Sequence, residues 1–363
     1  MKIYKIKEIC HLEKGKQIDT TLLSDANPYK YINGGIKESG YYTTYNTEGE
    51  TVLVSEGGAS CGYVNYINEK FWCGCHCYKL TQCKFLPKYI YYALKGNQEN
   101  LMTLRTGAAM PNIKKTTFQD LELLLNENPA EQEMVISELN NIQIAIDIKK
   151  TELSSLDDLV KSRFIEMFGD PRTNSKNLPE LTLPELGEFG RGVSKHRPRN
   201  APELLGGKYP LIQTGEVANA ELYINEYTNT YSELGYKQSK MWKAGTLCIT
   251  IAANIAKTGI LSFDACFPDS VVGFLANEKT NNIFIHFWFS FFQEILEAQA
   301  PASAQKNINL RILSELKVIV PPIELQNEFS EFVKLTDKSK FIVQKQIEDL
   351  QELLDSKMDE YFG

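Results

Sequence analysis

Four cysteines lie close together in the first quarter of this 363-residue sequence, and thiolates are common zinc ligands. Cys73, Cys75 and Cys77 are separated by single residues, and Cys83 follows. Structural zinc sites typically place roughly two to four residues between paired ligands, so this spacing fits a metal poorly. Because side chains alternate along a strand, the same spacing also fits one buried strand with three thiols on one face. We expect the buried strand and no metal, and metal binding by these four cysteines stays open as the alternative.

A second cluster of side chains is basic. Residues 191–199 contain four bases and a histidine among glycine and proline, so a regular helix is not expected there. Arginine presents a planar pair of donors that matches phosphate oxygens and the O6 and N7 edge of guanine. The alternative is a solvated basic loop. We favour DNA binding, with Arg191, Lys195, His196, Arg197 and Arg199 as the candidate residues.

Other polar, basic and aromatic residues are weaker candidates for contact with DNA, because their side chains donate hydrogen bonds or stack on bases. In the first half of the chain they are Lys14, Lys16, Gln17, Tyr41, Tyr42, Tyr45, Arg105, Asn112 and Lys114. In the second half they are Gln305, Lys306 and Asn307.

Motifs for catalysis or cofactor binding are not found. The sequence has no Gly-x-Gly-x-x-Gly, no Gly-x-x-x-x-Gly-Lys phosphate loop and no His-Glu-x-x-His. An amino-methyltransferase needs an Asn-Pro-Pro-aromatic loop, whereas the nearest match is Asn27-Pro-Tyr. Pro268-Asp269 can be paired with Glu315-Leu-Lys317 as a nuclease motif, but the second piece is expected to be a strand. We therefore expect no catalytic residue, no metal and no cofactor.

We expect two long helices, each of which follows a globular part of the sequence. Taking every third and fourth residue alternately gives eleven positions in 128–169, of which eight are apolar, and the same seam in 321–363 has seven apolar or aromatic members. A period of 3.5 over this length is typical of a coiled coil. Asn128, Pro129 and Glu131 suit a helix start with a capping box. The expected helix-pairing residues are Val135, Leu139, Ile146, Leu153, Leu156, Val160, Phe329, Val333, Val343, Ile347, Leu350 and Leu354.

The sequence outside the helices repeats too. Segments 5–9, 49–55, 89–94 and 110–125 have counterparts at 183–186, 245–250, 284–289 and 305–320. We expect an α+β fold: two globular mixed α/β domains separated by two long helices, which pack as an antiparallel coiled coil with a pseudo-two-fold internal repeat. The expected parts are 1–127, a central helix at 128–169, 170–320 with a short linker at 170–178, and a second helix at 321–363. The alternative is that each helix dimerises with another protein.

Charge is distributed unevenly along the chain. The net charge is −7, but 127–170 and 321–363 carry −6 and −5, which leaves +4 for the remainder. A mildly basic remainder permits DNA binding without proving it. The N-terminus lacks the apolar core of a signal peptide, and the most apolar run, 283–292, is too short to span a bilayer. We expect a cytoplasmic protein with reduced cysteines.

These features together resemble the specificity subunits of Type I restriction-modification systems. The resemblance rests on a twice-repeated ending of each globular part. It runs from Thr106-Gly-Ala-Ala-Met-Pro-Asn-Ile to Asn128-Pro-Ala-Glu-Gln in the first copy, and from Ser303-Ala-Gln-Lys-Asn-Ile-Asn to Pro321-Pro-Ile-Glu in the second. It covers essentially the whole chain, including Glu166-Met-Phe-Gly-Asp-Pro. Each motif is loose, whereas their order, duplication and spacing are specific.

The resemblance implies two target-recognition domains, each of which binds one half of a split sequence in double-stranded DNA. It also implies that methylation and cleavage belong to separate subunits: methyltransferase (M) subunits, here expected to be two, and restriction (R) subunits that join through the complex. The chain departs from a perfect repeat, since Glu324-Leu-Gln326 replaces the adjacent Glu131-Gln132 and the basic loop has no equally basic counterpart. An asymmetric target is therefore expected. The alternatives are a stand-alone DNA-modifying enzyme and a coiled-coil scaffold that binds proteins.

Overall fold

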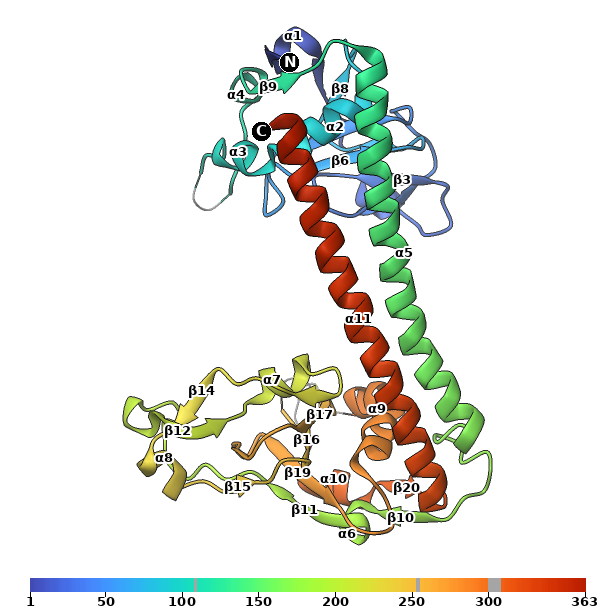
Figure 1. Ribbon diagram of the computed structural model, residues 1–363, viewed down its shortest axis with the longest axis vertical. Helices are drawn as coiled ribbons and strands as arrows, with labels where there is room; N and C mark the ends of the chain where they lie inside the picture. Colours follow the sequence, from blue (N-terminus) through green and yellow to red (C-terminus); the bar gives the residue numbers. More distant parts are fainter. Residues whose placement is uncertain (108–109, 253–254, 300–307) are drawn as a thin grey trace. The chain divides into compact units, whose positions relative to one another are not determined.

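The structure, a computed structural model, describes residues 1–107, 110–252, 255–299 and 308–363 (Figure 1). It contains two compact units, Met1–Glu152 with Val343–Gly363, and Leu153–Ile342. Each unit combines a globular α/β part with one half of each of two 40-residue helices, α5 (Pro129–Phe168) and α11 (Ile323–Phe362). The bounds of these helices lie within two residues of 128–169 and 321–363 at each end.

The described part of the first unit has three sheets. A two-stranded sheet pairs β1 (Lys2–Lys5) with β9 (Glu122–Leu125). A four-stranded sheet has the strand order β2 (His11–Lys14), β8 (Cys77–Thr81), β5 (Thr51–Ser55), β6 (Val64–Ile67). A three-stranded sheet has the strand order β4 (Gly40–Tyr42), β3 (Tyr29–Ile32), β7 (Trp72–Cys73). The short helices are α1 (Ile6–Ile9), η1 (Thr20–Leu22), α2 (Pro87–Gly96), α3 (Gln98–Thr103) and α4 (Lys115–Gln119).

The described part of the second unit is built in the same way. A two-stranded sheet pairs β10 (Glu180–Thr182) with β20 (Lys317–Ile319). A five-stranded sheet has the strand order β11 (Gly187–Arg191), β19 (Val271–Ala276), β16 (Leu247–Thr250), β17 (Thr258–Leu261), β13 (Tyr223–Ile224). A four-stranded sheet has the strand order β14 (Asn229–Tyr231), β12 (Leu205–Leu211), β18 (Ala265–Cys266), β15 (Met241–Trp242). Its other helices are α6 (Leu183–Leu186), η2 (Pro202–Leu204), α7 (Thr214–Asn219), α8 (Glu233–Lys237), α9 (Asn282–Gln299) and α10 (Leu310–Glu315).

The two units share one topology. The order β2-β8-β5-β6 in the first corresponds to β11-β19-β16-β17 in the second, with antiparallel pairing throughout both. The three-stranded sheet of the first unit contains the parallel pair β3 and β7, and the four-stranded sheet of the second unit contains the parallel pair β12 and β18. The repeats predicted from sequence lie on these shared elements, because 49–55 and 245–250 enter β5 and β16, while 89–94 and 284–289 lie in α2 and α9. The pseudo-two-fold relation and the coiled-coil supercoil stay predictions.

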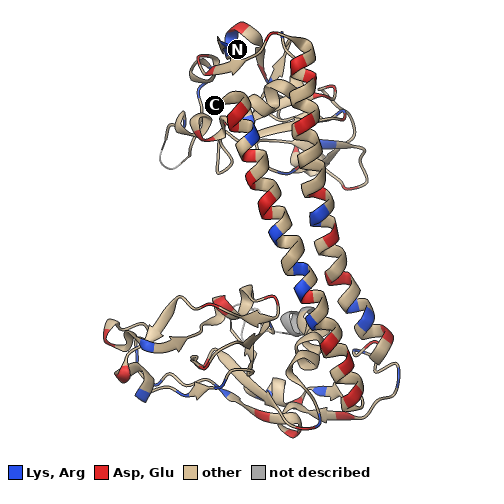
Figure 2. Ribbon diagram, viewed as in Figure 1, with Lys and Arg blue, Asp and Glu red and all other residues tan. Residues whose placement is uncertain are grey.

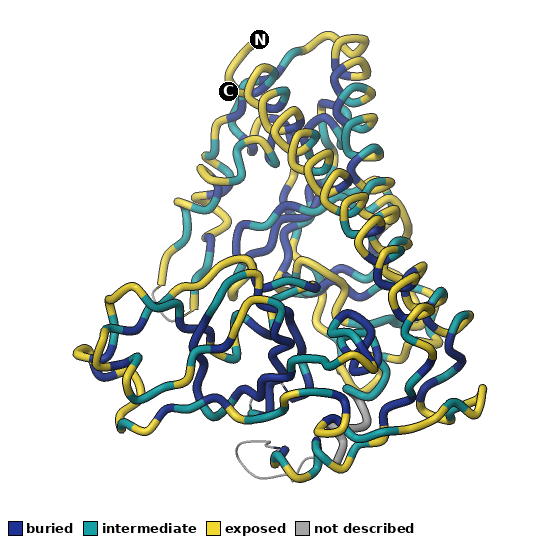
Figure 3. The backbone as a smooth tube through the Cα atoms, turned by 60° about the horizontal axis from the view of Figure 1, so that its bottom comes forward, coloured by how far each residue is buried: buried dark blue, intermediate teal, exposed yellow. Residues whose placement is uncertain are grey.

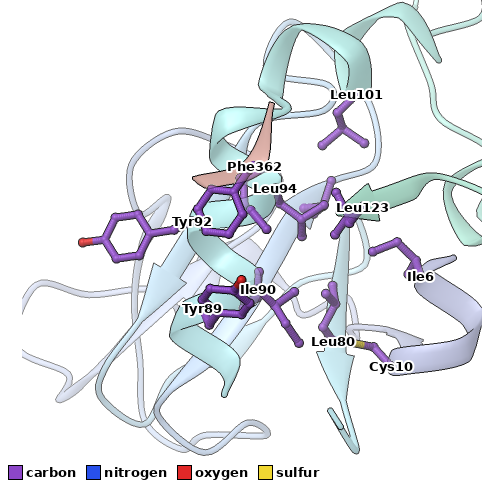
Figure 4. Packing of buried hydrophobic residues seen from close by; sticks show 14 of the residues in the cluster. Ile6, Cys10, Leu80, Tyr89, Ile90, Tyr92, Leu94, Leu101, Leu123 and Phe362 are labelled. Carbon is purple, nitrogen blue, oxygen red and sulfur yellow. The ribbon is translucent and has the colours of Figure 1, made fainter. Parts of the chain in front are cut away.

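Side chains from α2 and from the end of α11 close the core of the first unit (Figure 4). Tyr89, Ile90 and Leu94 of α2 are buried against the four-stranded sheet, where Leu80 lies in β8. The ring of Phe362 in α11 lies 5.2 Å from that of Tyr89. The last turns of α11 therefore belong to the apolar core of this unit, and burying a side chain as large as Phe362 stabilises it by about 1.5–3 kcal/mol.

The predicted apolar seam lies on the more buried face of both long helices. All eleven seam positions in each helix are buried or half-buried, and the positions between them are mostly exposed (Figure 3). The first members, Gln132 and Gln326, are polar because they anchor the helix to its own globular part. Gln132 accepts a hydrogen bond from the Leu86 backbone N–H, at 3.1 Å, and Gln326 accepts one from the Thr280 hydroxyl, at 2.8 Å.

Ion pairs join the halves of the two long helices within each unit. In the second unit Arg163 of α5 binds Glu328 of α11, at 2.9 Å, while Lys340 contacts Asp157. Residue numbers thus rise in one helix as they fall in the other. In the first unit Lys357 contacts Glu138, at 3.2 Å. The alternative, in which each helix finds its partner in another protein, is not needed to bury these seams.

The prediction of one buried strand through the cysteines is wrong. Strand β7 ends at Cys73, Gly74 to His76 form a turn, and β8 begins at Cys77. The turn forms because the Gly74 N–H donates to Ile32 and the Cys77 N–H donates back to Gly74. Cys73 and Cys77 are buried, whereas the Cys75 thiol contacts the side-chain oxygen of Gln17, at 3.0 Å. Cys83 lies elsewhere, with its sulfur 3.2 Å from that of Cys10. Among the described residues, His, Cys, Asp and Glu form no group of three that could hold a metal.

Candidate nucleic-acid interface

The basic loop of the second unit begins where the chain passes very close to the turn after β18. A Cβ atom at Gly192 would lie 2.2 Å from the carbonyl oxygen of Phe267. Gly15 occupies the same position in the first unit, where a Cβ atom would lie 2.3 Å from the carbonyl oxygen of Cys73. Only glycine allows such an approach of two backbones. Each unit therefore projects a loop from the same place in the fold.

The second-unit loop is held by side chains that are far away in sequence. Gln238, directly after α8, accepts hydrogen bonds from the backbone N–H groups of Lys195, at 2.5 Å, and His196, at 3.0 Å. The Ser239 hydroxyl donates to the carbonyl oxygen of Val193, at 2.7 Å. Three such ties hold the backbone of the loop, while the side chains of Lys195, Arg197 and Arg199 are exposed.

Asp269 binds both arginines that follow in the loop. Its carboxylate lies 3.4 Å from the guanidinium of Arg197 and 2.5 Å from that of Arg199. Arg197 also donates to the carbonyl oxygens of Ser194, at 2.6 Å, and His196, at 2.8 Å. The aspartate comes from the turn between β18 and β19, so sequence inspection of 191–199 alone missed it. In the sequence, this contact is indicated by nothing more than one acidic residue, Asp269, in a turn of the second globular part.

Of the other candidates in this loop, Lys195 is exposed, and Arg191 is exposed at the end of β11. The His196 imidazole lies 3.9 Å from the Glu203 carboxylate. Of the five predicted residues of 191–199, the structure joins Arg197 and Arg199 through Asp269. Gln305, Lys306 and Asn307 lie outside the described residues.

The first-unit loop has a different set of side chains. Lys14 makes an ion pair, at 2.5 Å, with Glu56, a carboxylate that is largely buried. The Tyr78 hydroxyl donates to the same carboxylate, at 2.9 Å. Burial, helped by this carboxylate, raises the pKa of Tyr78 well above its usual value. Lys14 is thus part of a structural cluster, whereas Lys16 is exposed and Gln17 contacts the turn at Cys75.

Aromatic rings gather on the three-stranded sheet of the first unit. Tyr41 and Tyr42 lie in β4, and the Tyr42 ring lies 4.9 Å from that of Trp72 in β7. Tyr45 follows β4, and its ring lies 5.1 Å from that of Tyr29 in β3 and 4.4 Å from the ammonium of Lys70. Trp72, Tyr29 and Lys70 were missed from sequence, because the pairing of β3, β4 and β7 brings them together.

The remaining first-unit candidates flank one loop. Arg105 donates to the carbonyl oxygen of Cys61, at 2.8 Å, which ties its guanidinium to the backbone. Asn112 exchanges backbone hydrogen bonds with Thr106, both at 2.9 Å. Lys114 is exposed just before α4. Arg105 and Asn112 thus make contacts within the protein.

The fold is a duplicated α/β unit carried on two long helices, and each unit presents a polar loop at the same place. The sequence profile of a family described as Type I restriction modification DNA specificity domain matches residues 1–157 and 180–352. The chain belongs to this family. Among the described residues, no helix is both long and apolar enough to cross a membrane.

Individual relatives agree with this assignment. A protein named as a type I specificity subunit in Mycoplasma genitalium is 26% identical over 98% of this chain and 92% of its own length. Another, from Mycoplasma pneumoniae, is 25% identical over 97% of this chain and 93% of its own length. Both are called specificity subunits, the class expected from the resemblance.

Solved structures share the fold. The S subunit of a type I restriction-modification system from M. genitalium superposes with a TM-score of 0.62 at 22% identity, covering 100% of this chain and 96% of that one. A chain from a study of complex assembly and conformational transition of the type I R-M system gives 0.62 at 11% identity, covering 99% and 97%.

Proposed function

We propose that each unit reads one half of an asymmetric, bipartite DNA sequence on behalf of a type I restriction-modification complex. The observation that carries the proposal is that one topology occurs twice with different side chains at the same place. Asp269 of the second unit binds two arginines, whereas Cys75 at the corresponding turn of the first unit contacts Gln17. Because different donor and acceptor sets read different base pairs, the two half-sites differ.

A domain exchange tests this assignment of one half-site to each unit. Residues 179–320 would be replaced by the corresponding segment of a relative with different loops, and the chimaera expressed with its methyltransferase subunits. Mapping of methylated sites across the genome should show a new second half-site and an unchanged first half-site. The same exchange at 1–127 is the matched control, and it should alter only the first. A chimaera that changes both halves, or neither, contradicts the proposal.

The two long helices are proposed to set the gap between the half-sites. Each has 40 residues, and four more residues would add about 6 Å at about 1.5 Å per residue. One base pair adds about 3.4 Å along the DNA axis, so the spacer should lengthen by about one to two base pairs. Four residues also nearly complete a turn, so the apolar seam is rotated only modestly.

The insertion is best placed near Lys149, in the middle of α5. Methylated sites of the insertion variant should keep both half-site sequences and differ only in the spacer. An equally long insertion in the linker at 170–178 is the control, since it leaves both helices intact. Changed half-site bases with an unchanged spacer would mean that helix length does not set the distance.

The outer faces of α5 and α11 are proposed to dock two methyltransferase subunits, through which restriction subunits join the complex. Acidic residues recur along both helices (Figure 2), and the stretches 127–170 and 321–363 carry −6 and −5. Large apolar side chains are exposed between them, and clusters of exposed apolar residues mark protein interaction sites. These side chains are Met134, Ile144, Ile148, Leu159, Ile165, Leu325, Leu335, Phe341, Ile342 and Leu353.

The chain is further proposed to bind DNA without catalysing a reaction or holding a cofactor, and to act in the cytoplasm, where its DNA target would lie. Methyl transfer from S-adenosylmethionine by the purified chain alone would instead favour a stand-alone enzyme. A protein scaffold is the other alternative, and it would bind its partners equally well with Arg197 and Arg199 replaced by alanine.

A further inference from the structure

A cavity of about 590 Å³ lies beside the basic loop in the second unit. Arg199 and Asn200 line it from the loop, Gln213 and Thr214 from the start of α7, and Asn229 from β14. Amide groups, which offer donors and acceptors, and a guanidinium, which offers donors only, thus line one cavity. Convergent polar groups in a concave site are the usual means of fixing the orientation of a bound group.

Some of the polar capacity of this cavity is unused by the protein. The Gln213 backbone N–H donates to the Glu216 carboxylate, at 3.1 Å, and its side-chain amide lines the cavity with a donor and an acceptor. Arg199 contacts Asp269 through one terminal nitrogen and has further N–H donors. Arg197 differs, because it also donates to two backbone carbonyls of its own loop. Of the two arginines, Arg199 is therefore the one with donors available for a ligand.

Asp269 affects what Arg199 can bind. Its contact at 2.5 Å fixes the position of the guanidinium, and the side chains of Arg199 and Asp269 are 44% and 32% exposed, so the pair is accessible from solvent. A guanidinium held in place loses less conformational entropy when it binds a matching edge. The carboxylate also offsets its charge, which weakens attraction to phosphates in general. An arginine in this state favours a specific partner over the DNA backbone.

We propose that this cavity is the purine-reading site of the second unit, with Arg199 bound to O6 and N7 of a guanine and Asp269 as the residue that positions it. The inference rests on the proposed function, because it names the base that this unit reads. Guanine is the match because two parallel N–H donors of arginine meet its two major-groove acceptors. Asn200 and Gln213 line the same cavity and suit a neighbouring adenine, whose N6 and N7 pair with a side-chain amide.

The test uses the full chain in complex with its methyltransferase subunits and a library of DNA randomised around both half-sites. Arg199→Ala and Arg199→Lys should lose preference for guanine at one position of the second half-site, by about ten-fold to a hundred-fold. The lysine variant separates geometry from charge, because it keeps the charge but cannot donate two parallel bonds. Lys208→Ala is the matched control, since Lys208 is a 75% exposed cation of the same unit.

Asp269→Asn is the test of positioning. It should reduce the preference for guanine, strengthen binding to unrelated DNA, and steepen the salt dependence by about one released counterion, because Arg199 is no longer neutralised. A residue with a purely structural role would not move the salt dependence in this direction. Asp269→Glu should restore part of the preference.

Three results would overturn the proposal. An unchanged second half-site in Arg199→Lys means that Arg199 reads no base there. A uniform loss of affinity for all sequences in Arg199→Ala, with a shallower salt dependence, means that it contacts phosphate. A parent complex that selects no bipartite site removes the proposed function and this proposal with it, whereas the first two results leave the proposed function intact. If Asp269→Asn does not fold, Arg199→Lys still decides the outcome.

Discussion

Truncation of Phe164 should strongly destabilise the second unit. It lies in α5 and is fully buried. Its ring lies 5.0 Å from those of Phe168 and Phe291, and 5.4 Å from those of Phe284 and Phe329. These partners come from α5, α9 and α11, so one side chain joins both long helices to the globular part.

The size of the effect follows from burial and from these ring contacts. Truncation of a buried phenylalanine to alanine costs about 3–5 kcal/mol, as lost transfer free energy and as a cavity. Each favourable aromatic pair adds about 0.5–1.5 kcal/mol beyond burial. Because Phe164 has four partners, we expect Phe164→Ala to lower the free energy of unfolding by about 4–5 kcal/mol, the upper part of that range. Phe164→Leu should lose about 1–2 kcal/mol, since it keeps most of the volume.

Chemical denaturation followed by circular dichroism measures this loss, and hydrogen exchange shows where it falls. Exchange should accelerate in Leu153–Ile342 and change little in the first unit. Phe341→Ala is the matched control, because Phe341 is 72% exposed on α11 and its removal should shift stability by less than about 0.5 kcal/mol. A loss below about 1 kcal/mol for Phe164→Ala would refute the view that this ring joins the long helices to the globular part.

Three further measurements test other contacts. Gln326→Leu should destabilise the second unit by about 1–3 kcal/mol, because it leaves buried partners such as the carbonyl oxygen of Pro321 unpaired, and a neutral result in denaturant titration would contradict this. Burial, with a smaller effect of Lys340, lowers the pKa of His286 from 6.5 to about 4. Because the unfolded chain binds the proton more readily, the free energy of unfolding should fall by about 1–3 kcal/mol as the pH drops from about 6.5 to about 4. The variant His286→Gln should remove this pH dependence. Deletion of 344–363 removes Phe362 from the first core, so it should lower the melting temperature and abolish recruitment of methyltransferase subunits; a truncated chain that still recruits two would argue against docking on the helices.

Sequence alone determined the elements whose signals are local. Helix α5 begins at Pro129 as expected, with the Ala130 N–H donating to the capping Asn128, at 3.1 Å, and it ends before Gly169, whose φ of +78° a glycine adopts readily. The Glu131 carboxylate accepts instead from side-chain amides, among them that of Asn128 at 3.3 Å, which is a small departure from the expected capping box. The 3.5-residue seam and the internal repeat were also visible, because periodicity and duplication depend on residue spacing within one segment.

Only the tertiary structure decided which distant groups meet. Asp269 lies 70 residues after Arg199 in sequence, yet it holds that side chain, because β18 and β19 return the chain to the base of the loop. The turn at Gly74 likewise depends on a hydrogen bond to Ile32, so alternation along 72–78 could not reveal it. A candidate loop can be recognised from its composition, but the partners that orient its side chains are set by strand pairing and packing between segments that carry no mark of each other.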